Sequence, residues 1–157
     1  MGHYHGGGGM HYSAQFIYDG NGRIIKWIDN DGVYDYFYTG NNITRRVYTE
    51  NSGVVWYVDS IRYNPDNSIA SIDFYDYSGT YYPDTPHNKA IFHYQVNKVS
   101  KVENLEYYAI YGGPPMIDTL VTTMTWDAAG NMVKMDFLDL YLGYADSVLY
   151  QYDNNPN

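Results

Sequence analysis

The chain has no cysteine among its 157 residues, and it carries only 9 Lys and Arg against 18 Asp and Glu. The absence of cysteine excludes disulfides, thiol catalysis and cysteine-based metal sites. The net charge of −9 argues against nucleic acid as a partner, because phosphate binding needs a basic face. The same charge disfavours adsorption to an anionic membrane surface.

Long hydrophobic runs are also missing. No apolar run approaches the roughly 20 residues of a membrane helix, and no signal peptide is visible. Residues 1–11 contain the glycine run Gly6–Gly9 and are interpreted as a flexible leader or tag, whose His3, His5 and His11 bind metal only opportunistically. Residues 12–157 are interpreted as one β domain.

Aromatic residues are abundant, at 18% of the chain with 21 Tyr. Six of them stand directly before polar turns rich in Gly, Asn, Asp or Pro, and we refer to these as the anchors: Tyr18, Tyr38, Tyr63, Tyr94, Trp126 and Tyr152. An aliphatic residue or Met restarts the chain five or six positions after the first five anchors, at Ile24, Ile43, Ile69, Val99 and Met132. This recurrence is an imperfect internal repeat of β-hairpins.

The segments between the turns are rich in β-branched and aromatic residues, which favours strands. Strands joined by short turns are antiparallel neighbours. The sequence therefore predicts an all-β fold, an antiparallel meander of about eleven strands built from repeated hairpins. We expect it to be strongly twisted and curled, as an open half-barrel or a nearly closed barrel. The segments Asp76–Lys89 and Tyr107–Pro115 are predicted to be long exposed loops.

The first hairpin, Tyr18-Asp19-x-x-Gly22-Arg23-Ile24, resembles the tyrosine–aspartate (YD) repeat. Trp126-Asp127-Ala128-Ala129-Gly130-Asn131-Met132 is similar, with Trp for Tyr and Asn for Arg. Degenerate copies follow Tyr38 and Tyr63, and shorter echoes are Asp59-Ser60-Ile61, Asp118-Thr119-Leu120 and Asp146-Ser147-Val148. The mixture resembles small secreted or lipid-anchored bacterial YD-repeat proteins and is distantly similar to Rhs-type toxin shells and teneurins. The resemblance covers about residues 12–153. It implies a β-meander and export to the cell surface, and it implies no catalytic residues.

Reactive constellations are not evident in the sequence. His87 and His93 lack the carboxylate-plus-His spacing of a zinc site, and Asp29-Asn30-Asp31-Gly32 lacks the distal Glu of a calcium loop, so a turn between hairpins is the better interpretation. No nucleophile elbow is present. We expect no enzyme activity and no cofactor.

Exposed aromatics are the one functional hint, because a strip of Tyr and Trp on a sheet can stack on sugar rings or anchor an interface. The candidate binding residues are Tyr34, Tyr36, Trp56 and Tyr57. The alternative is that Tyr is only the favoured cross-strand pairing residue of a thin sheet. The favoured hypothesis is a non-catalytic structural or interaction module of a bacterial cell-surface or secreted protein. A glycan- or peptide-binding module is the alternative.

Three structural expectations follow from these patterns. The anchors should be mostly buried, each beside the residue that restarts its hairpin. Gly22 and Gly130 should have positive φ, as their turns require. Val148–Tyr152 should be an edge strand without charged guards, which favours pairing with a second copy, as a homo-oligomer or filament, or closure of the sheet onto residues 12–18.

Overall fold

The computed structural model describes residues 14–77, 86–108 and 116–152. Every regular element in these residues is a β-strand, and eleven strands form one sheet. They are β1 (Gln15–Tyr18), β2 (Ile24–Ile28), β3 (Gly32–Thr39), β4 (Asn42–Glu50), β5 (Val55–Tyr63), β6 (Ile69–Asp76), β7 (Asn88–Gln95), β8 (Lys98–Tyr108), β9 (Met116–Trp126), β10 (Met132–Asp139) and β11 (Tyr144–Leu149).

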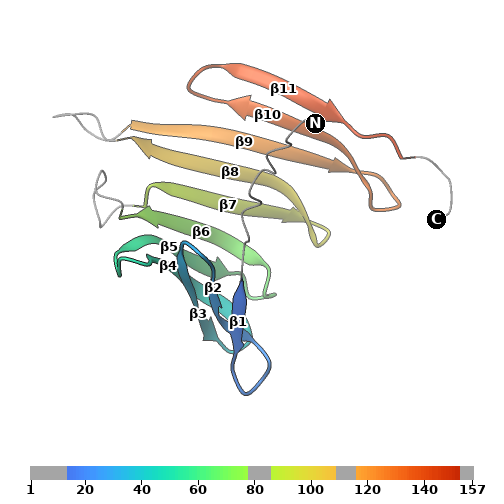
Figure 1. The fold of residues 1–157 in the computed structure, drawn as a ribbon. Helices are drawn as coiled ribbons and strands as arrows, with labels where there is room; N and C mark the ends of the chain where they lie inside the picture. Colours follow the sequence, from blue (N-terminus) through green and yellow to red (C-terminus); the bar gives the residue numbers. More distant parts are fainter. Residues whose placement is uncertain (1–13, 78–85, 109–115, 153–157) are drawn as a thin grey trace, which may run out of the picture.

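The topology is the simplest one available to such a chain. The strand order in the sheet is the order in the sequence, and every pair is antiparallel (Figure 1). β1 and β11 are the two ends of this order, so the sheet is open and not a closed barrel. The predicted meander and its strand number are confirmed, and of the two shapes left open by the sequence the open one is observed. No helix long and apolar enough to cross a membrane occurs in the described part of the chain.

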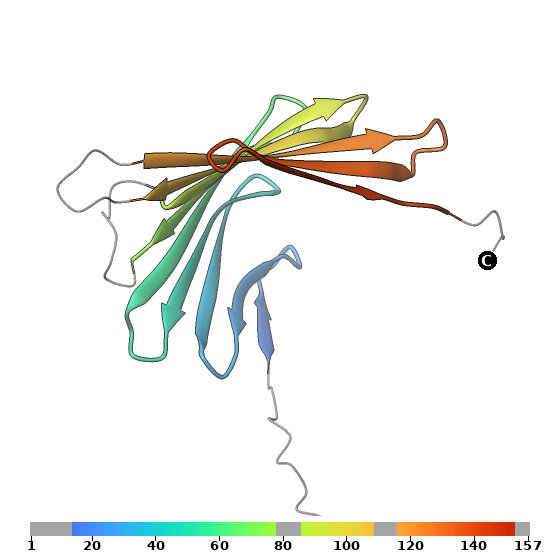
Figure 2. The same ribbon diagram turned by 90° about the horizontal axis from the view of Figure 1, so that it is seen from above.

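The sheet is strongly curled. Seen from above, the N-terminal strands turn away at a large angle from the C-terminal strands β9–β11 (Figure 2). A register shift of one residue recurs beside the turn that follows each of the first five anchors, from Ile17/Tyr18 in the first hairpin to Met132/Lys134 in the β9–β10 hairpin. Such bulges increase the local right-handed twist, which accounts for the curl.

The turns explain the repeated motif in chemical terms. In the first hairpin Gly22 N donates to Asp19 O at 3.1 Å, and the Asp19 carboxylate accepts the backbone N–H groups of Asn21 and Arg23 at 2.8 and 3.0 Å. The turn at Asp127 repeats these bonds, with Gly130 N at 3.1 Å from Asp127 O and Asn131 N at 2.8 Å from the carboxylate. The φ values of +78° at Gly22 and +93° at Gly130 confirm the prediction for both glycines. Asp and Gly are thus fixed by the turn geometry.

The same turn carboxylates titrate abnormally. Backbone N–H groups of Arg23 and Asn131, aimed at Asp19 and Asp127 respectively, lower the pKa of each carboxyl below its ordinary value. A hydrogen bond to the charged form favours ionisation, so these turns are most stable with the carboxylates charged.

The sheet has almost no core, because within the described residues nothing covers either face. Only Val47 and Val58 are buried hydrophobic residues there, at 9% and 5% exposure. The expectation that the first five anchors are mostly buried is wrong for Tyr18, which is 55% exposed on the edge strand β1. Tyr38, Tyr63, Tyr94 and Trp126 have most of their surface covered but are not fully buried. Full burial would need a second layer to pack against, and a single-layer sheet offers none.

The anchors join neighbouring hairpins by hydrogen bonds. Four of them reach across to the neighbouring hairpin and donate a side-chain hydrogen bond to the carbonyl of the residue that restarts it, an arrangement we term the clamp. The clamps are Tyr38 to Ile24 (2.7 Å), Tyr63 to Ile43 (2.9 Å), Trp126 to Val99 (2.8 Å) and Tyr152 to Met132 (2.9 Å). Backbone pairing between these hairpins stops short of the turns, as at Lys26↔Asp35 and Lys101↔Thr123. The clamp therefore satisfies a carbonyl that the diverging neighbouring strand no longer reaches.

Candidate functional site

Of the four candidate binding residues, the structure brings together Tyr34, Tyr36 and Tyr57 on one face of the sheet, as alternation along β3 and pairing through Tyr48 require. Trp56 is adjacent to Tyr57 in β5 and lies at a register shift in the pairing of β5 with β4. The two rings lie edge to face with their centroids 6.1 Å apart, so the bulge leaves Trp56 without a pairing partner in β4 and places its ring against that of Tyr57.

Sequence reasoning missed a longer array that contains two of these residues. One ring from each of the strands β1 to β6 joins a continuous series, which we call the aromatic ladder: Phe16, Trp27, Tyr34, Tyr48, Tyr57 and Phe74. Successive ring centroids are 6.1, 4.9, 4.6, 5.9 and 5.3 Å apart. Pairing places Phe16, Trp27, Tyr34, Tyr48 and Tyr57 directly opposite one another, and Phe74 is reached on the diagonal.

The orientation of the rings limits what the ladder can bind. Its neighbouring rings are inclined by only 16–32°, so they face one another along the direction that crosses the strands. Each inner ring therefore has both faces covered by other rings, and only ring edges and phenol groups point outward. Burial raises the pKa of the Tyr34 and Tyr48 phenols above the ordinary value, as expected for groups within an aromatic array. The interior of the ladder is a stabilising array of cross-strand pairs rather than a platform for sugar rings.

The face that carries the ladder, which we call the ladder face, is hollowed. A small hollow of about 180 Å³ is lined by Tyr34, Tyr48, Tyr57 and Phe74 together with the ion pair Arg46–Asp59. A second hollow of about 360 Å³ continues from Phe74 across β7 and β8 to Leu120 in β9. Since side chains of β4 and β9 border the same space, the ladder face is the concave side of the curl.

The opposite face, which we call the ion-pair face, is organised by charge. Lys26 pairs with Asp35 at 3.0 Å, and Lys134 with Asp136 at 2.8 Å. Asp73, whose side chain is 3% exposed, lies between Arg62 at 2.7 Å and Lys89 at 3.5 Å. The pairs of Lys26 with Asp35 and of Asp73 with Arg62 and Lys89 join neighbouring strands, as the ladder does on the other face, whereas Lys134 and Asp136 lie on the same strand. The Lys101 ammonium lowers the pKa of the Glu103 carboxyl there by hydrogen bonding.

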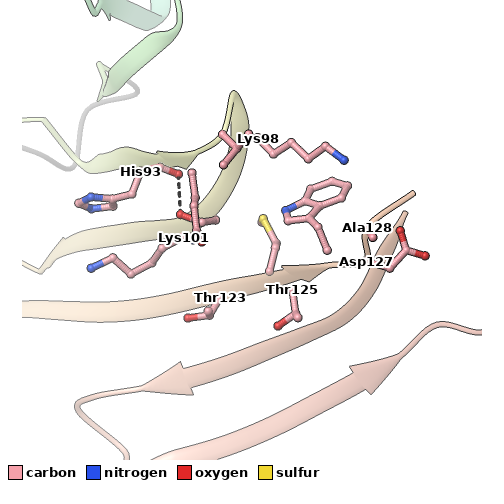
Figure 3. Close-up of a pocket in the computed structure, with 12 residues that line it drawn as sticks. His93, Lys98, Lys101, Thr123, Thr125, Asp127 and Ala128 are labelled. Carbon is pink, nitrogen blue, oxygen red and sulfur yellow. Dashed lines mark hydrogen bonds between the residues drawn. The ribbon is translucent and has the colours of Figure 1, made fainter. Parts of the chain in front are cut away.

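A larger hollow than these two lies where the hairpins β7–β8 and β9–β10 diverge (Figure 3). It has about 840 Å³ and contains Lys98, whose ammonium lies 4.9 Å from the ring centre of the clamp residue Trp126. In Figure 3 Lys98 and Lys101 extend in opposite directions, so their charges do not converge on one point. This space is a gap between splayed turns, spanned by the Trp126–Val99 bond, and we assign it no ligand.

Two expectations about metals concern the described residues. The segment Asp29–Gly32 is a turn in which the Asp29 carboxylate accepts the N–H groups of Asp31 and Gly32 at 2.9 and 3.0 Å. His93 lies on β7 with its ring 3.5 Å from Glu103. No group of three or more His, Cys, Asp or Glu side chains that could hold a metal ion occurs in the part of the chain the structure describes. His3, His5 and His11 lie outside the described residues.

The two edges of the sheet differ from its interior in exposure. All four residues of β1 and all six of β11 are exposed. The C-terminal hairpin exposes a series of large apolar side chains, with Leu142 at 72% and Leu149 at 73% the most exposed among Leu138, Leu140, Tyr141, Leu142, Tyr144, Val148 and Leu149. The predicted edge strand Val148–Tyr152 ends earlier than expected, because the last residue of β11 is Leu149. Tyr152 lies beyond the strand and forms a clamp.

Comparison with known proteins gives a likeness of fold. No family model matches the chain, and no curated protein matches it. Among solved structures, it is similar to a chain of the Tc holotoxin pore of Photorhabdus luminescens, with a TM-score of 0.62 and 14% identity. A crystal structure of TcdB2-TccC3-TEV is similar to the same degree, with a TM-score of 0.62 and 14% identity. The match covers 87% of this chain but only 7% of each of those chains. At this identity the likeness is one of fold.

Proposed function

We propose that this chain is a non-catalytic structural and interaction module of a bacterial secreted or cell-surface protein, of the YD-repeat kind. The observation that carries the proposal is a single-layer sheet with both faces uncovered in the described residues and both edges exposed. A sheet normally buries its apolar side against another layer. A sheet that does not do so is built to be covered by something else.

The repeat chemistry supports the assignment to the YD kind. The residues that define the motif, Asp19 with Gly22 and Asp127 with Gly130, are used for the turns, and the anchor aromatics are used for clamps. All of these roles are structural. The likeness of fold to a small part of large toxin assemblies supports a scaffold role and export, in keeping with the resemblance noted from the motifs.

Self-association through the edges is the interaction we favour. β11 has neither Lys nor Pro, the residues that most often guard an edge strand, and Asp146 is its one charged side chain, while Val148 and Leu149 are exposed. A second copy can add its own edge to such a strand by backbone hydrogen bonds. Pairing of two β11 strands gives a dimer, whereas pairing of β11 with β1 of another copy gives a filament.

Sedimentation velocity over a range of protein concentrations tests this role. The matched variants are Val148→Lys on the edge strand β11 and Val55→Lys on the interior strand β5, whose Val residues are 41% and 37% exposed. We expect the unmodified protein and the Val55→Lys variant to associate as concentration rises, and the Val148→Lys variant to stay monomeric. A monomer at every concentration, with fast hydrogen exchange at alternate β11 amides, would contradict edge pairing.

A further inference from the structure

The aromatic ladder has an end that differs from its interior. Phe74 is the last ring, because its partner across the strand pair is the short side chain of Asn88. Beyond it the ladder face carries Ala90 on β7 and Asn104 on β8, which are also directly paired. Six strands that each carry a bulky ring are thus followed by a patch of short side chains on a concave surface.

This change in side-chain size makes the 360 Å³ hollow. Its apolar walls are Ile72 and Phe74 on one side and Leu120 on the other, and its polar residues are Arg46, Asp59, Asn88, Lys89, Asn104 and Glu106. The volume lies at the lower end of the range of small-ligand sites. The hollow therefore combines an aromatic wall with planar amide, carboxylate and guanidinium groups on adjacent strands.

The hollow and the row of residues beside it contain buried acceptors without donors among the described residues. The Oδ1 atom of Asn88 is buried and has no hydrogen-bond partner among the described residues. In the same row Asn88 pairs with Glu106, and Glu106 pairs with Asp118, whose Oδ1 is likewise buried without a partner in the described part of the chain. A buried acceptor without a donor costs free energy that a bound donor restores.

We propose that this hollow is a binding site for a neutral saccharide unit of an oligosaccharide chain. Sugar hydroxyl groups supply the donor that Asn88 lacks, and the amide of Asn104 can both donate and accept. The C–H groups of a sugar ring pack against the aromatic wall at Phe74, since the negative face of an aromatic ring attracts them. The two cations of the lining, Arg46 and Lys89, are paired with Asp59 and Asp73, so the carboxylates of Glu106 and of its neighbour Asp118 disfavour an anionic sugar. The site goes beyond the scaffold role and is independent of edge pairing.

The residues that contact the sugar differ from the strip of Tyr and Trp that the sequence suggested. Tyr34 and Tyr57 have their ring faces covered by neighbouring rings, so they support the wall at Phe74 instead of contacting the sugar. The ligand-contacting residues become Phe74, Asn88 and Asn104.

Titration followed by NMR of the side-chain amides tests the proposal. The probes are three neutral hexasaccharides, cellohexaose, maltohexaose and the hexamer of N-acetylglucosamine, with tetragalacturonate as the anionic comparison. We expect at least one neutral probe at millimolar concentration to shift the Asn88 and Asn104 amide signals, and tetragalacturonate to shift neither.

Variants separate specific binding from a general effect. Ala90→Leu fills the hollow, and Ala145→Leu is the same change at an exposed position of β11. We expect Ala90→Leu to weaken binding at least tenfold and Ala145→Leu to leave it unchanged. Asn88→Ala, which adds no bulk to the fold, should weaken binding about three- to tenfold. No amide shift with any neutral probe would overturn the proposal, as would equal binding by tetragalacturonate or unchanged binding in both Ala90→Leu and Asn88→Ala.

Discussion

The strands β1–β6 and β7–β11 stabilise the same single-layer sheet in different ways. The first group carries the aromatic ladder, with one ring stacked on the next from Phe16 to Phe74. The second group has no stacked ring pair in its described residues and instead has the two longest strands, β8 and β9, with eleven residues each against four in β1 and five in β2. A sheet without a second layer can therefore gain stability from side-chain stacking across short strands or from backbone pairing along long ones.

The junction between β6 and β7, which we call the seam, lacks the clamp hydrogen bond found at the other junctions between hairpins. Tyr94 is the one anchor among Tyr38, Tyr63, Tyr94, Trp126 and Tyr152 without a clamp bond to a described residue. Across this seam the Lys89–Asp73 ion pair joins β7 to β6 on the ion-pair face. The ladder ends at the same seam, so the junction of β6 and β7 is where the two modes of stabilisation meet.

The largest effect should come from a break in the ladder. Tyr48 stacks on Tyr34 at 4.6 Å and on Tyr57 at 5.9 Å, whereas Phe137 of β10 has no ring partner in the described residues. We expect Tyr48→Ala to lower the free energy of unfolding by about 2–3 kcal/mol and Phe137→Ala by about 1–1.5 kcal/mol, the difference being two aromatic pairs. Urea denaturation measures both. Equal losses would show that the rings stabilise only by burial.

The clamps should give the next largest effect. Tyr63→Phe removes the hydroxyl that donates to the Ile43 carbonyl at 2.9 Å and keeps the ring. The expected loss is about 1 kcal/mol, the usual contribution of one neutral hydrogen bond. Tyr94→Phe is the matched control at the anchor without a clamp, and it should change the free energy of unfolding by less than about 0.3 kcal/mol. A comparable loss at Tyr94 would remove the distinction between this seam and the others.

A turn in the second group offers a gain in stability. The β7–β8 turn places Val96 at φ +50° and Asn97 at φ +62°, whereas the other positions of positive φ in the described residues are occupied by glycine or Asn67, with Gly22 at +78° as an example. Left-handed backbone is unfavourable for a β-branched residue, and Val96 is 88% exposed, so its side chain gains little from burial. Val96→Gly should therefore raise the free energy of unfolding by about 0.5–1 kcal/mol. Gly22→Val should lower it, and the opposite signs in a denaturation series would confirm that turn chemistry, not packing, is limiting.

Most of the fold could be predicted from turn residues and turn lengths. Turn residues such as Asp19 and Gly22 specify hairpins by themselves, and the order of the strands follows from the shortness of the turns. Long-range geometry could not be derived in this way. The bulges at Ile17/Tyr18 and Phe37/Tyr38 shift the register by one residue, and one residue decides which face a ring occupies.

The candidate site was harder to predict for the same reason. Trp27 and Tyr34 flank one turn and their pairing is readable from the sequence, but the extension to Phe74 requires the registers of all the intervening strands. The hollow beside Asn88 and Asn104 depends in addition on the curl, which brings Arg46 of β4 and Leu120 of β9 to one space. The exposure of Tyr18 was mispredicted because a sequence does not reveal whether a second layer exists.

The smallest effect should appear in alkaline solution, and it compares the same two groups of strands. Burial raises the pKa of Tyr34 and Tyr48 in the ladder, while in the second group the nearby Asp146 carboxylate raises the pKa of the exposed Tyr144. A raised phenol pKa means that the folded state prefers the neutral form. This stabilisation is fully present below the unfolded pKa of about 10 and is lost as the pH rises through the folded pKa. Ionised phenols within the ladder would also repel one another at ring separations near 5 Å. The first group should therefore loosen at a lower alkaline pH than the second.

Single-tryptophan variants that retain Trp27 in the ladder or Trp126 in the clamp report on each group by fluorescence. Coincident transitions would contradict a separate contribution of the ladder phenols, and loss of the early Trp27 transition in a Tyr34→Phe, Tyr48→Phe double variant would assign it to them.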